Sequence, residues 1–212
     1  MRNQFIAIEG NIGAGKTTLA TMLAKDWDAR LMLEEFAENS FLPLFYENPD
    51  KYAFPLELSF LGERFEQLKK TLVATDLFNP LVVSDYYILK SLLFAKINLG
   101  EAEYNLFHKL FYIIFDSFPK PDLIVYLDSS ISTLQKNIKH KGRPYELNIK
   151  NEYLESLHKN YMEAFKQTTI PVLLINTSDK NFISDLTFFE QIKIEIAKVY
   201  KQIGRASCRE RV

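Results

Sequence analysis

One short segment restricts the fold of this chain more than any other feature of its sequence. Residues 10–17 have the sequence GNIGAGKT, which matches the pattern GxxxxGK[ST] of a phosphate-binding loop. An apolar run at residues 4–9 comes directly before it, and a run with helical spacing at residues 17–25 follows. A strand, a glycine-rich loop and a helix in this order form the context in which such a loop binds phosphate.

Each part of this loop has a physical role in binding a nucleoside triphosphate. The glycines allow a tight turn whose N–H groups point inward, and the following helix adds the positive end of its dipole. We expect Lys16 to reach the β- and γ-phosphates and the Thr17 hydroxyl to bind Mg²⁺. The alternative is a glycine-rich turn with an incidental lysine, but the flanking strand and helix favour phosphate binding. The predicted nucleotide-binding residues of the segment are Gly10, Asn11, Ile12, Gly13, Ala14, Gly15, Lys16, Thr17 and Thr18.

Apolar segments alternate with helical spacing along the rest of the chain. The predicted strands are residues 4–9, 30–34, 81–85, 123–128 and 171–176, and the predicted helices are 17–25, 55–75, two within 86–118, 131–141, 151–166 and 185–201. Several strands are apolar on both faces and end in an acidic residue, which is typical of parallel strands covered on both sides by helices. We therefore predict a doubly wound α/β fold with ligands at the carboxyl ends of the strands, where Glu34 and Asp85 lie.

Composition excludes several other classes of protein. With 212 residues and 47% hydrophobic residues, the chain has the makeup of one domain with a single core. Its formal charge of -1 gives no electrostatic reason to expect binding to nucleic acid or to an anionic membrane. The N-terminal apolar run is too short to span a bilayer, so we expect a cytoplasmic protein. One Cys and three scattered His exclude a disulfide framework and give no metal-ligand spacing.

The last ten residues differ from the rest. Residues 203–212, IGRASCRERV, abandon the preceding amphipathic pattern and resemble a translated sequencing adapter. A native basic tail is the alternative. We interpret residues 1–202 as the domain and residues 203–212 as a non-native tail, in which Cys208 has no function.

Four blocks of the sequence resemble the deoxynucleoside kinase family, with a pattern similar to bacterial deoxyguanosine kinases. In chain order they are EGNIGAGKTT, EEFAENSFLPLFYENPDKYAFPLELSFLGERF, VVSDYYILKSLLFAK and KGRPYE. The resemblance spans residues 5–200. It implies a P-loop kinase fold with a five-stranded parallel sheet flanked by helices, a lid segment, and a homodimer formed through helices. It also implies transfer of the γ-phosphoryl group of ATP or another nucleoside triphosphate to the 5′-hydroxyl of a deoxynucleoside.

The resemblance implies a role for two acidic residues near the phosphates. Glu34 matches the residue that acts as general base on the 5′-hydroxyl, and a carboxylate at a strand end can accept that proton. A solvated loop charge is the alternative for Glu34. Asp85 is expected to bind Mg²⁺ directly or through water. Many relatives carry an arginine directly after this acidic residue, but here Tyr86 stands in its place, so the cation at that position is missing.

Two residues match the family's contacts to the sugar. Tyr46 and Glu146 correspond to a tyrosine and a lid glutamate that bond the 3′-hydroxyl, and together they supply a donor and an acceptor. For Tyr46 an ordinary half-buried aromatic residue is the alternative.

The base-recognition helix carries Glu57 where many relatives have Gln. A carboxylate has only acceptors, which suits the N1–H and N2–H₂ donors of guanine but not the edge of adenine or cytosine. Arg64 lies seven residues later on the same helical face, and arginine is the usual partner of guanine O6 and N7. We predict that Glu57 and Arg64 frame a guanine. The alternatives are a solvated charge pair or a direct Glu57–Arg64 pair.

A basic stretch after the fourth strand is the predicted lid. Lys136, Lys139 and Arg143 recur at i, i+3 and i+7, so one helical face would carry cations toward the donor phosphates. A solvated basic face is the alternative. Aromatic residues that could stack on the base, none of them preferred, are Phe41, Phe45, Phe54, Phe60 and Phe94.

These features favour a deoxyguanosine kinase. A deoxyadenosine or broad-specificity deoxynucleoside kinase is the main alternative, with Glu57 protonated or bridging through water. A nucleotide-binding module without catalysis is a further alternative, which Lys16, Thr17 and Glu34 make less favourable.

Overall fold

The computed structural model describes residues 4–34, 39–72, 81–115 and 118–209, and its backbone follows the predicted α/β pattern. The strands are β1 (Gln4–Gly10), β2 (Arg30–Met32), β3 (Leu81–Ser84), β4 (Leu123–Asp128) and β5 (Val172–Asn176). The helices are α1 (Lys16–Asp26), α2 (Phe41–Glu47), α3 (Pro49–Leu72), α4 (Lys90–Asn98), α5 (Glu101–Phe115), α6 (Ile131–Lys141), α7 (Asn151–Gln167) and α8 (Leu186–Arg209).

The five strands form one parallel sheet in the order β2-β3-β1-β4-β5. β1 lies at its centre and pairs with β3 on one side and β4 on the other. From β1 the chain passes to the edge strand β2, returns to β3 beside β1, and then crosses to β4 and β5 on the other side. The loops after β1 and β3 therefore meet at a switch point, where ligands bind in such sheets. The predicted fold class, a five-stranded parallel sheet flanked by helices, is confirmed.

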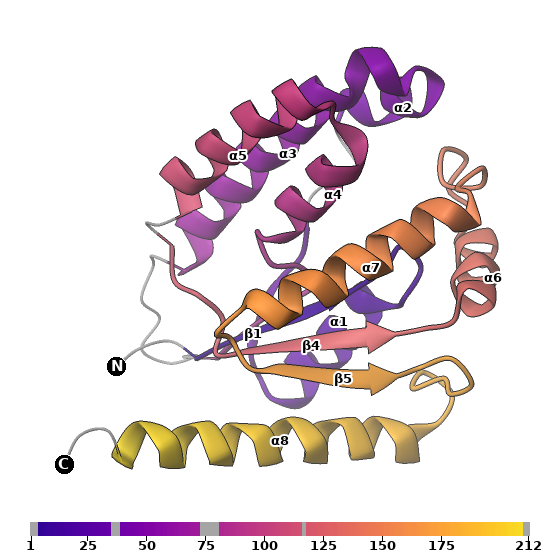
Figure 1. Ribbon diagram of the computed structural model, residues 1–212. Coiled ribbons are helices and arrows are strands. Elements are labelled where there is room, and N and C mark those ends of the chain that lie inside the picture. Colours follow the sequence, from indigo (N-terminus) through magenta and orange to yellow (C-terminus); the bar gives the residue numbers. More distant parts are fainter. Residues whose placement is uncertain (1–3, 35–38, 73–80, 116–117, 210–212) are drawn as a thin grey trace.

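Alternate residues of β1 bury against two different helical layers. Ile6 and Ile8 pack in a cluster with residues of α1 and α8. Phe5 and Ala7 face a second cluster formed with α3, α4 and α5. Figure 1 shows α8 beside β5 on one side of the sheet and α7 with α4 on the other. Side chains of a strand alternate between its faces, so strands covered on both sides are apolar on both faces, as residues 5–8 of β1 and residues 123–127 of β4 are.

Two predicted boundaries in the first half of the chain differ from the observed ones by two or more residues. The strand expected at residues 30–34 ends at Met32, because the next residues turn so that the Glu34 N–H donates to Asp85 Oδ1 at 2.7 Å. The helix expected from Pro55 begins at Pro49, after Asn48, whose side chain accepts from the Lys51 N–H at 3.3 Å. The expected end of that helix, at residues 73–75, lies outside the described residues.

The C-terminal helix α8 also continues beyond its expected end, to Arg209 instead of Lys201. Its amphipathic part supplies Phe188, Phe189, Ile192 and Ile196 to the core. The domain boundary at residue 202 and the non-native origin of residues 203–212 stay predictions. Within the described residues, no helix is long and apolar enough to cross a membrane.

Candidate functional site

A cavity of about 120 Å³ lies where the loops after β1, β2 and β3 meet. It is lined from the sheet side by the glycine-rich loop and from the other side by α2, α3, α4 and the segment after α6. Predicted site residues in its wall are Ile12, Gly13, Lys16, Thr17, Glu34, Tyr46, Glu57, Arg64, Asp85, Arg143 and Glu146. Residues far apart in the sequence therefore meet in one site, as the strand-end argument predicts.

The glycine-rich loop has the backbone of a phosphate site. Gly13 and Gly15 have φ angles of 81° and 90°, in the left-handed region that favours glycine. A Cβ atom on Gly13 would lie 2.8 Å from the Leu134 carbonyl oxygen, so the close approach of α6 requires glycine there. Lys16 Nζ donates to the Asn11 carbonyl at 2.9 Å. Burial, followed by the charge of Lys90, lowers the pKa of Lys16 to about 8.

The two predicted magnesium ligands lie together. Thr17 Oγ1 donates to Asp85 Oδ2 at 2.6 Å, and the other carboxylate oxygen of Asp85 accepts from the Glu34 backbone. The described residues contain no group of three or more His, Cys, Asp or Glu side chains that could hold a metal. One carboxylate and one hydroxyl nevertheless fit Mg²⁺, which usually takes one or two protein oxygens and completes its shell with phosphates and water.

Glu34 is held between two cations. Its Oε1 accepts from Arg64 Nε at 3.0 Å and Nη2 at 2.5 Å, and its Oε2 accepts from Lys90 Nζ at 2.5 Å. Burial opposes ionisation, but Lys90 and Arg64 outweigh it and hold the pKa of Glu34 well below its usual range. Glu34 is therefore a carboxylate at every working pH. The alternative of a solvated loop charge does not fit a side chain that is only 8% exposed.

Glu57 is a buried carboxylate with one oxygen free. Its Oε1 accepts from Asn98 Nδ2 at 2.7 Å, and Tyr153 Oη donates to Asn98 Oδ1 at 3.1 Å. Among the described residues, Glu57 Oε2 is buried with no hydrogen-bond partner. Burial raises the pKa of Glu57 to about 7, against the opposing effect of the Asn98 hydrogen bond. An acceptor that is buried without a partner in a cavity wall is positioned for a ligand.

The predicted guanine frame of Glu57 and Arg64 stays a prediction, and in this structure the donors of Arg64 are directed to other protein groups. Arg64 directs Nε and Nη2 to Glu34 and Nη1 to Ser91 Oγ at 2.7 Å, and its guanidinium lies over Phe60. The direct Glu57–Arg64 pair is not formed either, since Glu57 bonds Asn98. Both side chains face the cavity as their spacing predicts. The guanidinium pairs with Glu34, which follows β2, and Glu57 pairs with Asn98.

The predicted sugar contacts lie beside each other. Tyr46 stacks on Tyr145 with ring centroids 5.6 Å apart, and Glu146 is the second contribution, after burial, to a raised pKa of the Tyr46 hydroxyl. Glu146 Oε1 accepts from Arg143 Nη1 at 2.8 Å. In the part of the chain that the structure describes, Glu146 Oε2 is buried without a partner. A hydroxyl and a free carboxylate oxygen thus face the same part of the cavity.

The predicted lid face was wrong. Helix α6 ends at Lys141, and Gly142 follows with a left-handed φ of 67°, so Arg143 does not continue the helical spacing of Lys136 and Lys139. Lys136 and Lys139 are exposed, whereas Lys141 and Arg143 line the cavity. A left-handed glycine after a helix ends the helical spacing. The basic residues of the site, Lys141 and Arg143, therefore lie at the end of α6 and just beyond Gly142, not along one face of the helix.

Comparison with known proteins identifies the protein family of this chain. The deoxynucleoside kinase family matches residues 6–201, which is nearly the whole chain. The chain belongs to the deoxynucleoside kinase family. Members of this family are phosphotransferases that use a nucleoside triphosphate donor, so this kinase is an enzyme of that class. A catalytically inactive nucleotide-binding module is thereby set aside.

Individual relatives of this kinase differ in the base they are named for. It is 36% identical over 203 residues to a deoxyguanosine kinase of Bacillus subtilis (strain 168), covering 92% of this chain and 97% of that protein. It is 35% identical over 197 residues to a deoxyadenosine kinase of Dictyostelium discoideum, covering 90% and 78%. A structure of M. mycoides deoxyadenosine kinase with bound dATP matches with a TM-score of 0.77 and 27% identity, covering 92% and 99%. Family membership therefore fixes the reaction class and leaves the base open.

Sequence reasoning missed Lys90 and Asn98 on α4 and Tyr153 on α7, all of which line the cavity. Lys90, Phe94 and Asn98 all line the cavity and are spaced at i, i+4 and i+8 on α4. Tyr153, on α7, completes the chain of hydrogen bonds to Glu57. The spacing was a usable signal, because these positions share one helical face directly after a strand end. Of the candidate stacking residues, Phe45, Phe60 and Phe94 line the cavity.

Proposed function

We propose that this kinase transfers the γ-phosphoryl group of ATP, or of another nucleoside triphosphate, to the 5′-hydroxyl of deoxyguanosine for nucleotide salvage. The observation that carries the choice of base is the free, buried Oε2 of Glu57 in the cavity wall. Guanine presents two adjacent donors, N1–H and N2–H₂, to such an acceptor. A base that offered an acceptor at this point would leave a buried carboxylate oxygen unpaired.

The positions of the other residues support this orientation of the substrate. With the base at Glu57, the sugar lies toward Tyr46 and Glu146 and the 5′-hydroxyl toward Glu34, which we assign as the general base. Lys16 and the loop N–H groups hold the donor phosphates, and Arg143 closes over them from the lid side. Thr17 and Asp85 would hold Mg²⁺, which neutralises charge on the phosphates.

One observation favours the alternative of a deoxyadenosine or broad-specificity kinase. With a pKa of about 7, Glu57 is partly protonated near neutral pH, and a protonated carboxyl has a donor as well as an acceptor. That form suits the amino group and ring nitrogen of adenine. We therefore expect the ratio of kcat/KM for deoxyguanosine to that for deoxyadenosine to rise with pH through about 7. Initial rates with both nucleosides between pH 6 and 8.5 measure this ratio, and a constant ratio would contradict the proposed role of Glu57.

Replacing Glu57 by glutamine tests the base choice directly. Glu57→Gln is expected to weaken deoxyguanosine and improve deoxyadenosine, because an amide offers a donor beside its acceptor. The expected change in their kcat/KM ratio is about ten- to hundredfold, which corresponds to about 1–3 kcal/mol for one unpaired buried group. Initial rates with deoxyguanosine, deoxyadenosine, deoxycytidine and thymidine measure it. Glu66→Gln, an exposed position on the same helix, is the matched control. If the ratio of the two kcat/KM values stays within about threefold of the parent, the change in discrimination is below roughly 1 kcal/mol. That result would contradict the guanine hypothesis and favour the broad-specificity interpretation.

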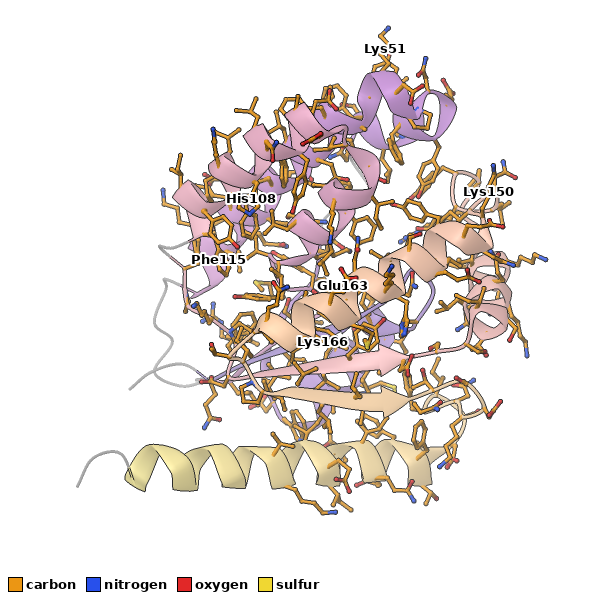
Figure 2. All side chains as sticks on the ribbon, viewed as in Figure 1. Lys51, His108, Phe115, Lys150, Glu163 and Lys166 are labelled. Atoms are coloured by element: carbon orange, nitrogen blue, oxygen red, sulfur yellow. The ribbon has the colours of Figure 1, made fainter. Side chains whose placement is uncertain are left out.

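We also propose that the kinase is a homodimer. A groove of about 440 Å³ lies between α5 and α7, and residues of α4 form its base. Three of its lining residues, His108 and Phe115 on α5 and Glu163 on α7, are labelled in Figure 2. The neighbouring surface of α5 exposes Leu106 and Ile113, the latter 77% exposed. Exposed apolar side chains beside a groove favour contact with a second copy, and two-fold dimers are the commonest closed assemblies. The cytoplasmic location stays a prediction.

Light scattering at micromolar concentration is expected to give the mass of a dimer. The measurement should use a chain shortened to end at Gln202, so that residues 203–212 cannot disturb it. Ile113→Glu, which places a charge on the exposed α5 face, is expected to shift the mass toward that of a monomer. Ile194→Glu, on the exposed face of α8, serves as control. A monomer for the unchanged chain would refute the dimer.

A further inference from the structure

The ion pairs of Glu34 present a problem for its role as a base. Both of its oxygens already accept hydrogen bonds from cations, Oε1 from Arg64 and Oε2 from Lys90. One lone-pair site remains on Oε2, but a carboxylate bonded to two cations is a weak base. Glu34 becomes a better acceptor for the proton of the 5′-hydroxyl when one of the two cations moves away.

The two cations are not equally free to move. Arg64 is also bonded to Ser91 Oγ, lies over Phe60, and is only 5% exposed in its side chain. Within the described residues, Lys90 Nζ has one hydrogen-bond partner, Glu34, and otherwise lies over the Phe94 ring at 5.3 Å. Lys90 is a point charge on a flexible stem, whereas the planar fork of Arg64 is fixed by its several bonds. Lys90 is therefore the cation that can leave.

The surroundings of Lys90 favour an anion as its next partner. It lines the cavity together with Lys16, so the two ammonium groups repel each other. Two lysines that repel each other in a partly desolvated cavity are both stabilised when a phosphate group comes between them. The residue after Asp85 supplies no such charge, because it is Tyr86, whose hydroxyl donates to Gln67 at 2.6 Å.

We propose, resting on the kinase function above, that Lys90 passes from Glu34 to the transferring phosphoryl group when the donor is bound. Its departure frees Glu34 Oε2, which accepts the proton of the 5′-hydroxyl. The bond between the 5′-oxygen and the γ-phosphorus forms, the bond from that phosphorus to the β–γ bridging oxygen breaks, and the nucleoside diphosphate leaves with that oxygen. Lys90 thus acts as a catalytic cation at the phosphoryl group, in addition to its pair with Glu34.

A purely structural role for Lys90 makes a different prediction from this transfer. A residue that only orients Glu34 would affect nucleoside binding and turnover together, whether or not phosphates are present. A cation that reaches the phosphoryl group would matter mainly for ligands that carry phosphate across the site. The discriminating probe is adenosine joined through a polyphosphate chain to the 5′-oxygen of the best-accepted deoxynucleoside.

The experiment compares Lys90→Met, Lys90→Arg and the exposed control Lys25→Met. Lys90→Met is expected to lower kcat by about ten- to hundredfold and to weaken the joined probe by about tenfold or more, as measured by calorimetry. Its Kd for the nucleoside alone should stay within about threefold of the parent. Lys90→Arg should restore probe binding to within about threefold, since the charge is retained. If Lys90→Met fails to fold, by circular dichroism, Lys90→Gln replaces it with the same readouts.

Equal weakening of the nucleoside and the joined probe would overturn the proposal and leave Lys90 as a structural partner of Glu34. Unchanged kcat and probe affinity would overturn it as well. Failure of the underlying function gives a distinct result, because the unchanged protein would then phosphorylate no deoxynucleoside.

Discussion

Replacing Lys16 by alanine is expected to lower kcat for phosphoryl transfer by about 10³-fold or more while leaving the fold intact. Lys16 is the loop cation that we place on the β- and γ-phosphates, where it opposes charge that develops as the group is transferred. Its hydrogen bond in the free protein goes to a backbone carbonyl, that of Asn11, and not to a carboxylate. Its removal therefore leaves no buried charge unpaired.

The lowered pKa of Lys16 supports the same expectation for stability. A lysine whose pKa falls to about 8 in the folded chain, from an ordinary value of about 10.4, is less stable in its charged form there than in the unfolded chain. It therefore opposes folding below pH 8, and this penalty disappears as the pH rises from 8 toward 10.4. Lys16→Ala should thus unfold at a urea concentration equal to or above that of the parent at pH 7.

Donor binding supplies a second measurement on Lys16. Only the protonated amine attracts phosphate, so affinity for a non-hydrolysable ATP analogue should fall as the pH rises above about 8 in the parent. Lys16→Ala should bind more weakly and lose this dependence. Lys25→Ala, an exposed lysine on the same helix, is the control. Loss of helical circular dichroism in Lys16→Ala, or turnover within tenfold of the parent, would contradict the assignment.

The order of strand, glycine-rich loop and helix could be predicted because its information is local. The strand before it, the left-handed glycines and the first residue of α1 are all encoded within a few residues of one another. The pairing of Thr17 with Asp85 could also be anticipated, because both follow neighbouring parallel strands and so lie at the same edge of the sheet.

The partners of Arg64 could not be predicted, because they depend on competition between carboxylates. Helical spacing correctly placed Glu57 and Arg64 on one face toward the cavity. The carboxylate partner of the Arg64 guanidinium depends on two other contacts. Asn98 donates to Glu57, and the loop after β2 places Glu34 beside Arg64. Neither contact has a local signature. The same holds for Lys90, whose partner lies 56 residues away in the sequence.

The predicted lid face was wrong for a different reason. The spacing of Lys136, Lys139 and Arg143 assumes an uninterrupted helix, and the sequence already contains the residue that ends it, Gly142. A glycine directly after a basic last turn is a common helix end. Gly142 therefore predicts that Arg143 lies beyond the helix, where its guanidinium donates to Glu146.

Replacing Glu34 by glutamine is expected to lower kcat by about 10²-fold with the KM for the nucleoside within about threefold of the parent. Glutamine preserves the size and one acceptor of the side chain but cannot take the proton of the 5′-hydroxyl. An interaction made mainly in the transition state affects kcat more than KM. Glu155→Gln, an exposed position on α7, is the control. A change confined to KM would reassign Glu34 to substrate binding.

The same substitution has a predictable cost in stability. Glutamine leaves Arg64 and Lys90 buried without a countercharge, and breaking a buried ion pair from one side costs about 3–5 kcal/mol. The depressed pKa of Glu34 means that its contribution is fully present above its unfolded pKa of about 4.3 and is lost as the pH falls below that value. Urea unfolding should therefore show a large gap between parent and Glu34→Gln at pH 7 and a smaller one at pH 3.5. If the difference in unfolding free energy between parent and variant stays constant with pH, the Glu34 carboxylate is not held by its two cations in solution. If kcat falls and the two proteins are equally stable, proton transfer is the sole role of Glu34.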